Sequence, residues 1–416
     1  MIDPLIIVRA VHIAASVVMA GAIFFELAIA RPVLLAWPDE EAANRYITAL
    51  RRLIWASLLT ALASGLLWAL LLAAKIAGTS VVQALGDGTF STLLSETRFG
   101  QVWLIRVCFA AVTAGALLVR PFGSARWLGF LGATAFLSAL AFVGHAGARQ
   151  GAIGWLQLGA DITHLLAAGA WLGSLPALAL LLADRARIAL DLCAAATRRF
   201  STFGVGIVAI LLTSGVINAW TVTDSLAAFT ETTYGRLLLL KIALFAAMAG
   251  LAATNRWYWT PQLPAARPIR TIRRLSLTEA GLGVVVIAVV GALGTLPPPI
   301  HQRMHANLAS EGAFVHLHDV YAMADVSAMP GRVGPSEITV RLFSEDFSPL
   351  RAQSVTLRLT HPSAGSLSLP ASPGPDGAWR VSDAPLSAAG IWTIVIEATT
   401  SGRKKISLDG PIVIQP

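Results

Sequence analysis

Eight apolar stretches fill the first 300 residues of this 416-residue chain, and a more polar segment follows them. Each stretch is long enough to cross a membrane as a helix, which takes roughly 20 mostly apolar residues. Helices are expected because lipid cannot satisfy exposed backbone groups. The pattern predicts a polytopic α-helical membrane protein with eight transmembrane helices. They lie at residues 5–30, 53–74, 102–119, 127–143, 156–182, 202–221, 236–254 and 278–297.

After three prolines at 297–299 the pattern changes from helical to alternating. SEITVRLF, SVTLRLTH and IWTIVIEATT are rich in β-branched residues and are bounded by turn sequences such as SPGPDG. About seven short strands in this length are typical of an immunoglobulin-like sandwich. We therefore expect a transmembrane domain at 1–300 and a C-terminal all-β immunoglobulin-like sandwich domain at 301–416. We detect no internal repeat.

The charge distribution predicts an orientation in the membrane. The net charge is +8, but residues 301–416 hold nine basic and ten acidic residues, so the positive excess lies in the membrane part. The loops 31–52, 120–126, 184–200 and 255–276 hold 15 Lys and Arg, whereas the alternate loops hold three. Basic loops stay in the cytoplasm. The N-terminus and the C-terminal domain are therefore predicted to lie outside it, and the charge pattern does not favour nucleic acid as a partner.

Several ionisable residues fall inside the predicted spans, where they are costly and commonly functional. His12 and His164 lie at a similar depth in the outer half of the membrane, and His145 lies at the outer end of the fourth span. Asp161 is three residues before His164 and could hold its ring. The alternative for each histidine is a hydrogen bond between helices. Arg106 and Lys241, also in the outer half, could pair with Asp161 or extend outward.

Two further residues of the first span lie on the same helix face as His12. Met19 and Glu26 follow it at steps of seven residues, so the three side chains share one helix face. We keep Met19 and Glu26 as weaker candidate metal ligands. Plain packing is the alternative for Met19.

Four histidines gather at the start of the outer domain. His316 and His318 share a strand face and are candidate metal ligands, while His301, His305 and Met323 are weaker candidates. Imidazole with thioether suits copper, and no HExxH motif points to zinc. The alternative for His316 and His318 is an ordinary solvated surface. The sequence contains no P-loop, GxSxG or GxGxxG motif, so we expect no ATP-driven pump and no enzyme.

Five segments resemble the CopD family of bacterial copper-resistance membrane proteins. They are GHAGA at 144–148, DITHLLAAGAWLGSLPAL at 161–178, TSGVINAW at 213–220, TTYGRLLLLKIALFAAMAGLAATNR at 232–256 and FVHLHDVYAMADVSAMPGRVGP at 314–335. The last looks like a domain often fused to this family. The resemblance implies copper uptake across the bacterial inner membrane and copper tolerance. It also implies His12, His145 and His164 as membrane copper ligands.

Two functional hypotheses of different classes follow. In the leading hypothesis a periplasmic outer domain captures copper, from solution or from a periplasmic copper carrier, and the membrane histidines pass it inward. In the alternative, His12 and His164 are the axial ligands of a haem in a membrane electron-transfer protein. A metal sensor or assembly factor is a third option.

Overall fold

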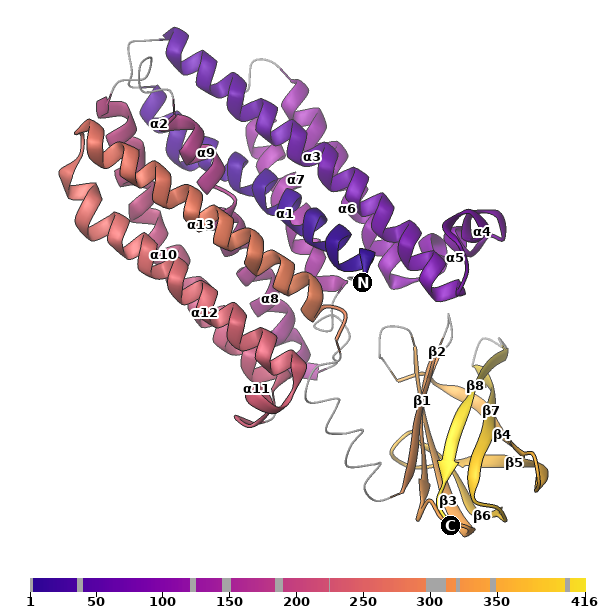
Figure 1. Ribbon diagram of the computed structural model, residues 1–416. Coiled ribbons are helices and arrows are strands. Elements are labelled where there is room, and N and C mark those ends of the chain that lie inside the picture. The colour runs from indigo at the N-terminus through magenta and orange to yellow at the C-terminus, as the bar shows by residue number, and fades with distance from the viewer. Residues whose placement is uncertain are drawn as a thin grey trace. The chain divides into compact units, whose positions relative to one another are not determined.

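The computed structural model describes residues 3–35, 40–119, 125–143, 151–183, 190–223, 225–296, 312–318, 322–344, 349–400 and 405–416. The chain divides into a helical unit and a unit that holds all the described strands. In the described part of the chain, eight helices or helix pairs are long and apolar enough to cross a membrane. This confirms the predicted fold class, a polytopic helical membrane protein followed by an all-β domain (Figure 1).

The helical unit consists of two sets of four membrane-crossing segments, and each set has short helices between its second and third segments. The first half contains α1 (Pro4–Phe25), η1 (Glu26–Ala30), α2 (Arg31–Leu34), α3 (Glu40–Ala77), α4 (Val81–Gly86), α5 (Thr89–Glu96), α6 (Arg98–Leu118), α7 (Ala125–Ser138) and η2 (Ala139–Phe142). The second half contains α8 (Gly151–Leu172), α9 (Leu175–Leu181), α10 (Leu190–Val222), α11 (Ala228–Glu231), α12 (Thr233–Thr254), η4 (Asn255–Trp259), η5 (Thr260–Gln262) and α13 (Ala266–Leu293).

The third long helix of each half begins with the same capping turn. Thr97 caps α6: its Oγ1 accepts from Gly100 N at 3.1 Å and donates to the Leu93 carbonyl at 2.6 Å. Thr232 caps α12 in the same way, with distances of 2.9 Å to Gly235 N and 2.8 Å to the Ala228 carbonyl. Both caps use the side-chain oxygen to satisfy an unpaired N–H of the first turn.

Glycine is required three residues after each of these caps. A Cβ added at Gly100 would lie 2.2 Å from the Leu93 carbonyl oxygen, and one at Gly235 would lie 2.0 Å from the Ala228 carbonyl oxygen. The short helices α5 and α11 therefore fold back on α6 and α12 at the same point of the same turn.

Helices α1 and α8 cross closely, and their contacts are reciprocal. A Cβ at Gly21 of α1 would lie 2.2 Å from the Gly169 carbonyl oxygen of α8. A Cβ at Gly173, directly after α8, would lie 2.0 Å from the Val17 carbonyl oxygen of α1. Because Val17 and Gly21 stand five and nine residues after His12, and Gly169 and Gly173 stand five and nine after His164, corresponding positions exchange contacts.

These correspondences correct the expectation that the chain lacks an internal repeat. The two halves share their capping turns and the reciprocal crossing. Each half has four membrane-crossing segments, so matching helices run in the same direction. This is the arrangement of parallel repeats in membrane proteins, in which two halves are related by an axis along the membrane normal.

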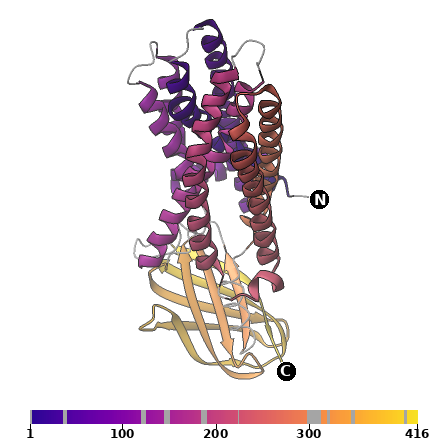
Figure 2. The ribbon, with the colours of Figure 1, turned by 90° about the vertical axis from the view of Figure 1, so that its left-hand side faces the viewer.

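The β unit contains eight described antiparallel strands, one more than the approximate number expected. They are β1 (Ala313–His318), β2 (Ala322–Met329), β3 (Gly334–Ser344), β4 (Ala352–His361), β5 (Gly365–Pro373), β6 (Trp379–Leu386), β7 (Gly390–Thr400) and β8 (Lys405–Ile414). Their order is β1-β2-β3-β6-β5-β4-β7-β8. Only two residue pairs join β5 to β6, so the strands form two sheets that pack face to face (Figure 2).

The two sheets enclose a core of alternating apolar residues. In β2 and β7 every second side chain is buried, and Trp392 of β7 is fully buried, with its indole N–H donating to the Ala388 carbonyl at 2.9 Å. The edge strands β1 and β8 approach each other, because a Cβ at Gly410 would lie 2.5 Å from Leu317 Cδ2. The sandwich therefore nearly closes on itself.

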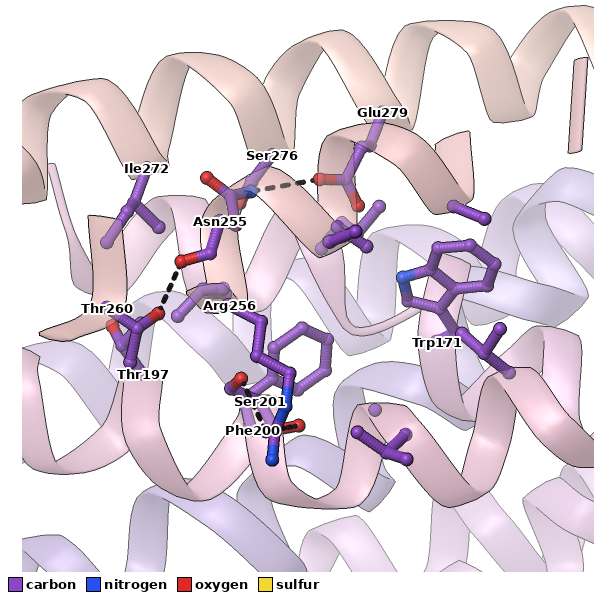
Figure 3. Close-up of a pocket in the computed structure, with 18 of the residues that line it drawn as sticks. Trp171, Thr197, Phe200, Ser201, Asn255, Arg256, Thr260, Ile272, Ser276 and Glu279 are labelled. Carbon is purple, nitrogen blue, oxygen red and sulfur yellow. Dashed lines mark hydrogen bonds between the residues drawn. The ribbon is translucent and has the colours of Figure 1, made fainter. Parts of the chain in front are cut away.

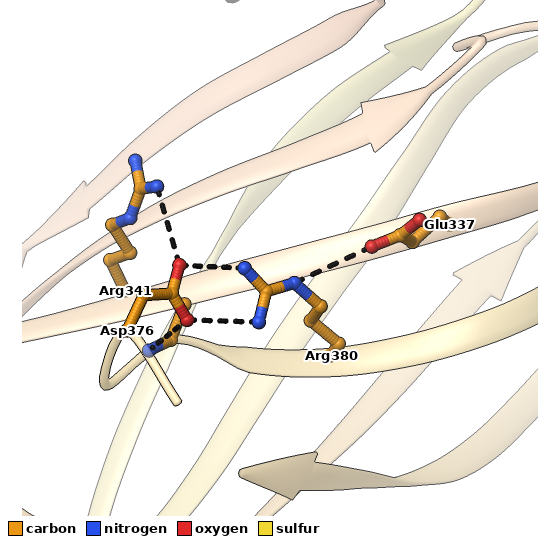
Figure 4. A network of polar contacts seen from close by, with 5 residues as sticks. Glu337, Arg341, Asp376 and Arg380 are labelled. Atoms are coloured by element: carbon orange, nitrogen blue, oxygen red, sulfur yellow. Dashed lines mark hydrogen bonds and ion pairs between the residues drawn. The ribbon is translucent and has the colours of Figure 1, made fainter. Parts of the chain in front are cut away.

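A surface network of charges links the start of β6 to the turn before it. Arg380 binds both carboxylate oxygens of Asp376, at 2.9 and 2.6 Å, while Glu337 and Arg341 lie 3.5 and 3.8 Å from this pair (Figure 4). The hydrogen bonds from Arg380 lower the pKa of Asp376 to about 2. The network is exposed to water, so it is expected to add little stability.

Candidate functional site

His164 lies in the wall of a cavity within the second half of the helical unit. The cavity has a volume of about 220 Å³ and is bounded by α8, α10, α12 and α13. Its wall is mainly apolar and aromatic, with Trp171 and Phe245 among its members. Beside His164, the wall contains the thioether of Met248 and the amine of Lys241. We call this space the outer cavity, because the orientation predicted from the sequence places His164 in the outer half of the membrane.

Hydrogen bonding fixes the orientation of the His164 ring. Its Nδ1 lies 3.0 Å from Ser214 Oγ on α10. The Ser214 hydroxyl already donates to the Ile210 carbonyl at 2.6 Å, so it accepts from Nδ1–H. A neutral imidazole in that tautomer keeps a lone pair on Nε2, which is the atom that could bind a metal ion.

Asp161 has a different partner from the one expected. We predicted that it holds the ring of His164, but Ser214 is the partner of Nδ1. Asp161 instead interacts electrostatically with Lys241 of α12, and Tyr234 lies close to the same carboxylate. The acid thus balances the positive charge of Lys241.

His12 has a similar backbone setting in the first half but a different environment. Its Nδ1 lies 2.8 Å from the Ala61 carbonyl and 3.3 Å from Ser64 Oγ, and a Cβ at Gly65 would lie 3.0 Å from its Cε1. In the second half the Ser214–Gly215 pair stands beside His164 in the same way. The buried Nε2 of His12 has no hydrogen-bond partner in the described part of the chain.

A buried guanidinium group accompanies His12. Arg106 stands nine residues after the cap Thr97, as Lys241 stands nine after Thr232. It is 3 % exposed, its Nη2 lies 3.3 Å from Ser16 Oγ, and its Cζ lies 4.2 Å from the ring centre of Phe136. Within the described ranges no carboxylate pairs with it. The positive charge beside His12 is therefore not balanced as it is beside His164.

The structure does not bring the membrane histidines into one set of neighbours. The contacts of His12 come from α3, α6 and α7, whereas those of His164 come from α10 and α12. Among the described residues, no group of three or more His, Cys, Asp or Glu side chains is placed to hold a metal ion. His145 lies outside the described residues, so its position stays a prediction.

The other two candidates of the first span are deeply buried. Met19 is completely buried in the apolar core of the bundle. Glu26 is 7 % exposed, begins the short η1 helix and interacts electrostatically with Arg51 and Arg31. These surroundings agree with packing for Met19 and with charge pairing for Glu26.

A second cavity lies along the same four helices, toward the opposite end of α10. It measures about 200 Å³ and has Glu279, Asn255 and Arg256 in its wall, together with several hydroxyl groups (Figure 3). We call it the inner cavity. Asn255 Nδ2 donates to Glu279 Oε1 at 3.0 Å, and Arg256 is bound to Ser201. Trp171 lines both cavities.

In the β unit, His316 forms a close pair that the sequence analysis missed. Its Nδ1 lies 2.6 Å from Asp325 Oδ1, directly across the β1–β2 pair. The backbone register places position 318 opposite Met323. Had residues 318 and 323 been paired as strand neighbours, an antiparallel register would have paired 316 with 325. His301 and His305 lie outside the described residues.

Other residues of the cavities were also missed. Met248 and Ser214 carry no signal that separates them from packing residues in an apolar helix. Glu279 is an acid inside a predicted span, and that alone was sufficient reason to include it.

Taken together, these features define a multi-pass membrane protein whose second half encloses a cavity with imidazole and thioether groups in its wall. Two family models match the chain: "Copper resistance protein D" at residues 194–293, and "Copper resistance protein D-like, N-terminal domain" at residues 1–155. The chain belongs to the copper resistance protein D family.

Three relatives illustrate the extent of the similarity. Copper resistance protein D of Pseudomonas syringae pv. tomato is 36 % identical over 226 residues, covering 51 % of this chain and 73 % of the relative. Inner membrane protein YebZ of Escherichia coli is 33 % identical over 206 residues, covering 49 % and 70 %. Copper transport protein CutJ of Bacillus subtilis is 28 % identical over 297 residues, covering 68 % of this chain and 51 % of the relative.

Proposed function

We propose that this protein carries copper inward across the bacterial inner membrane and thereby serves copper homeostasis and tolerance. Its family membership and the names of its relatives, which include a copper resistance protein and a copper transport protein, support this proposal. The transported species is the ion itself, so we assign no catalytic reaction to the chain.

The observation that carries the proposal is the composition of the outer cavity. His164 offers Nε2 and Met248 offers its sulfur in a space whose other walls are largely apolar. Imidazole and thioether are ligands that suit Cu(I). Because Asp161 balances Lys241, a bound Cu(I) ion would not face an uncompensated positive charge there.

We place the route through the second half of the bundle. From the outer cavity the ion would pass Trp171 and reach the inner cavity, since this residue borders both. His12 is left off this route, because the guanidinium of Arg106 would repel a cation. His145 remains a candidate ligand at the entrance.

The C-terminal domain, which we take as residues 301–416, is proposed to capture copper in the periplasm. Asp325 holds Nδ1 of His316, which is how carboxylates commonly orient a metal-binding imidazole. Position 318 and Met323 stand opposite each other two residues away. We further propose that both termini are periplasmic, as the basic loops predict, and that a periplasmic copper carrier delivers the ion.

Copper binding by variants of the full-length protein in lipid nanodiscs tests the proposal. In an anaerobic titration with a chromogenic Cu(I) chelator, His164→Ala should weaken copper binding by the membrane domain at least about tenfold, because even the loss of a residue that only orients a ligand costs that much. The titration is done in a background with His316→Ala and His318→Ala to remove copper binding by the outer domain. Met248→Leu should weaken it less, and Met19→Leu, in the first half, should not change it.

An unchanged titration of the His164→Ala variant would exclude the outer cavity as the copper site. The absorption spectrum tests the haem hypothesis in the same sample, since an intense Soret band would reveal haem. The separate neighbours of His12 and His164 do not favour them as one axial pair.

A further inference from the structure

The inner cavity holds a carboxylate without a balancing charge. Glu279 is 2 % exposed in the middle of α13, where an ionised side chain is costly. Its described partners are the neutral amide of Asn255 and the indole of Trp171. Arg256 is the other charged residue in the cavity wall, and its guanidinium is engaged by the carbonyl and hydroxyl oxygens of Ser201.

A second oxygen in the same place lacks a partner. Asn255 Oδ1 is buried and has no hydrogen bond among the described residues, although its Nδ2 is bound to Glu279. An unsatisfied buried acceptor is costly, so it marks a position where a donor or a cation is expected. Asn255 also begins η4, a π-helical turn, and such turns are frequent at functional sites.

The ligand chemistry of this cavity differs from that of the outer cavity. Its wall provides oxygen atoms from Glu279, Asn255 and the hydroxyls of Thr197, Ser201 and Ser276, beside the guanidinium of Arg256 and the indole of Trp171, and it contains no thioether or imidazole. Oxygen ligands suit hard cations, whereas Cu(I) binds preferentially to softer ligands such as thioethers.

From these observations we propose that the inner cavity binds a hard monovalent cation, with the Glu279 carboxylate and the Asn255 amide oxygen as its ligands. A proton and a sodium ion share this chemistry, and the experiment below separates them. If the proposed copper transport holds, such a site would supply a coupling ion to a chain that has no nucleotide-binding motif. The site itself does not depend on copper.

Modification by a hydrophobic carbodiimide tests the site in the full-length protein in nanodiscs. The reagent attacks protonated carboxyl groups in apolar surroundings, and mass spectrometry of peptides locates the adduct. Glu279 should react about tenfold faster than Glu26, the matched buried acid whose charge two arginines balance. Glu279→Gln should lose the adduct.

The arms of the experiment distinguish the two cations. If the site binds a proton, the reaction at Glu279 slows as the pH rises and sodium has no effect. If it binds sodium, sodium chloride protects Glu279 while choline chloride does not, and Asn255→Leu removes this protection. Reaction no faster than at Glu26, or reaction insensitive to both pH and sodium, would overturn the proposal.

Neither outcome depends on copper binding, so the two proposals fail separately. The copper titration of the His164→Ala variant reports on the outer cavity alone. A protein that binds no copper but reacts at Glu279 as described would retain the cation site and lose the transport function.

Discussion

The two halves of the membrane unit use one scaffold for two different electrostatic environments. Both place a histidine against a Ser–Gly pair and set a basic residue nine positions after a threonine cap. In the second half an acid balances the base and the histidine borders a cavity. In the first half Arg106 has no acid among the described residues, and His12 lies among aromatic rings.

The two halves therefore differ in whether the histidine borders a cavity or packs against other side chains. Trp68 and Phe136 occupy the surroundings of His12, and the side chain of Arg106 stacks on Phe136. The comparison therefore predicts that matched substitutions have equal effects where the halves agree and opposite effects where they differ.

The largest effect is expected at the crossing that both halves share. Gly173→Ala should lower the free energy of unfolding by more than about 3 kcal/mol, because its Cβ would meet the α1 backbone, which cannot move aside without separating the helices. Gly21→Ala should be as harmful, since its contact is the reciprocal one. Thermal unfolding of the detergent-solubilised protein measures both.

Gly204→Ala is the matched control, because nothing lies within 4 Å of a Cβ added there. It should leave the thermal transition nearly unchanged. A Gly173→Ala protein that melts like this control would refute the close crossing.

A smaller effect, of opposite sign in the two halves, is expected for the buried bases. Lys241→Met leaves Asp161 buried without its partner and should destabilise the protein by about 2 kcal/mol. Arg106→Met removes a buried charge that no described acid balances, so it should be neutral or stabilising. Asp161→Asn combined with Lys241→Met should recover most of the loss. Equal destabilisation by the two Met variants would contradict the difference between the halves.

The sequence was sufficient to predict the membrane spans, because the length and hydropathy of a segment alone identify them. It was not sufficient to predict which partners the polar residues inside the bundle have. Depth along a helix follows from counting, but the face that each side chain turns to its neighbours depends on how helices pack. Asp161 thus shares a helix face with His164, yet it interacts with Lys241, eighty residues away.

The internal repeat escaped detection for a related reason. The matching positions are few: a histidine, a Ser–Gly pair, a Thr-x-x-Gly turn and one basic residue. Between them stand apolar residues, many of which can be exchanged for other apolar residues of similar size. The first half has Arg106 where the second half has Lys241. The two halves therefore share a positive charge at the same position of the helix and not the same residue type.

The smallest effect tests whether the halves agree where their geometry is the same. Thr97→Ala and Thr232→Ala should each destabilise by about 1 kcal/mol, the usual loss of a threonine N-cap. The two values should agree, because both hydroxyls accept from the glycine three residues on and donate to the carbonyl four residues back. Serine keeps the oxygen, so Thr97→Ser and Thr232→Ser should retain most of the stability. Chemical unfolding of the four variants in mixed micelles gives the comparison. A loss at one cap alone would mean that the two turns, though alike in shape, support their halves unequally, and the repeat would then be limited to the crossing of α1 and α8.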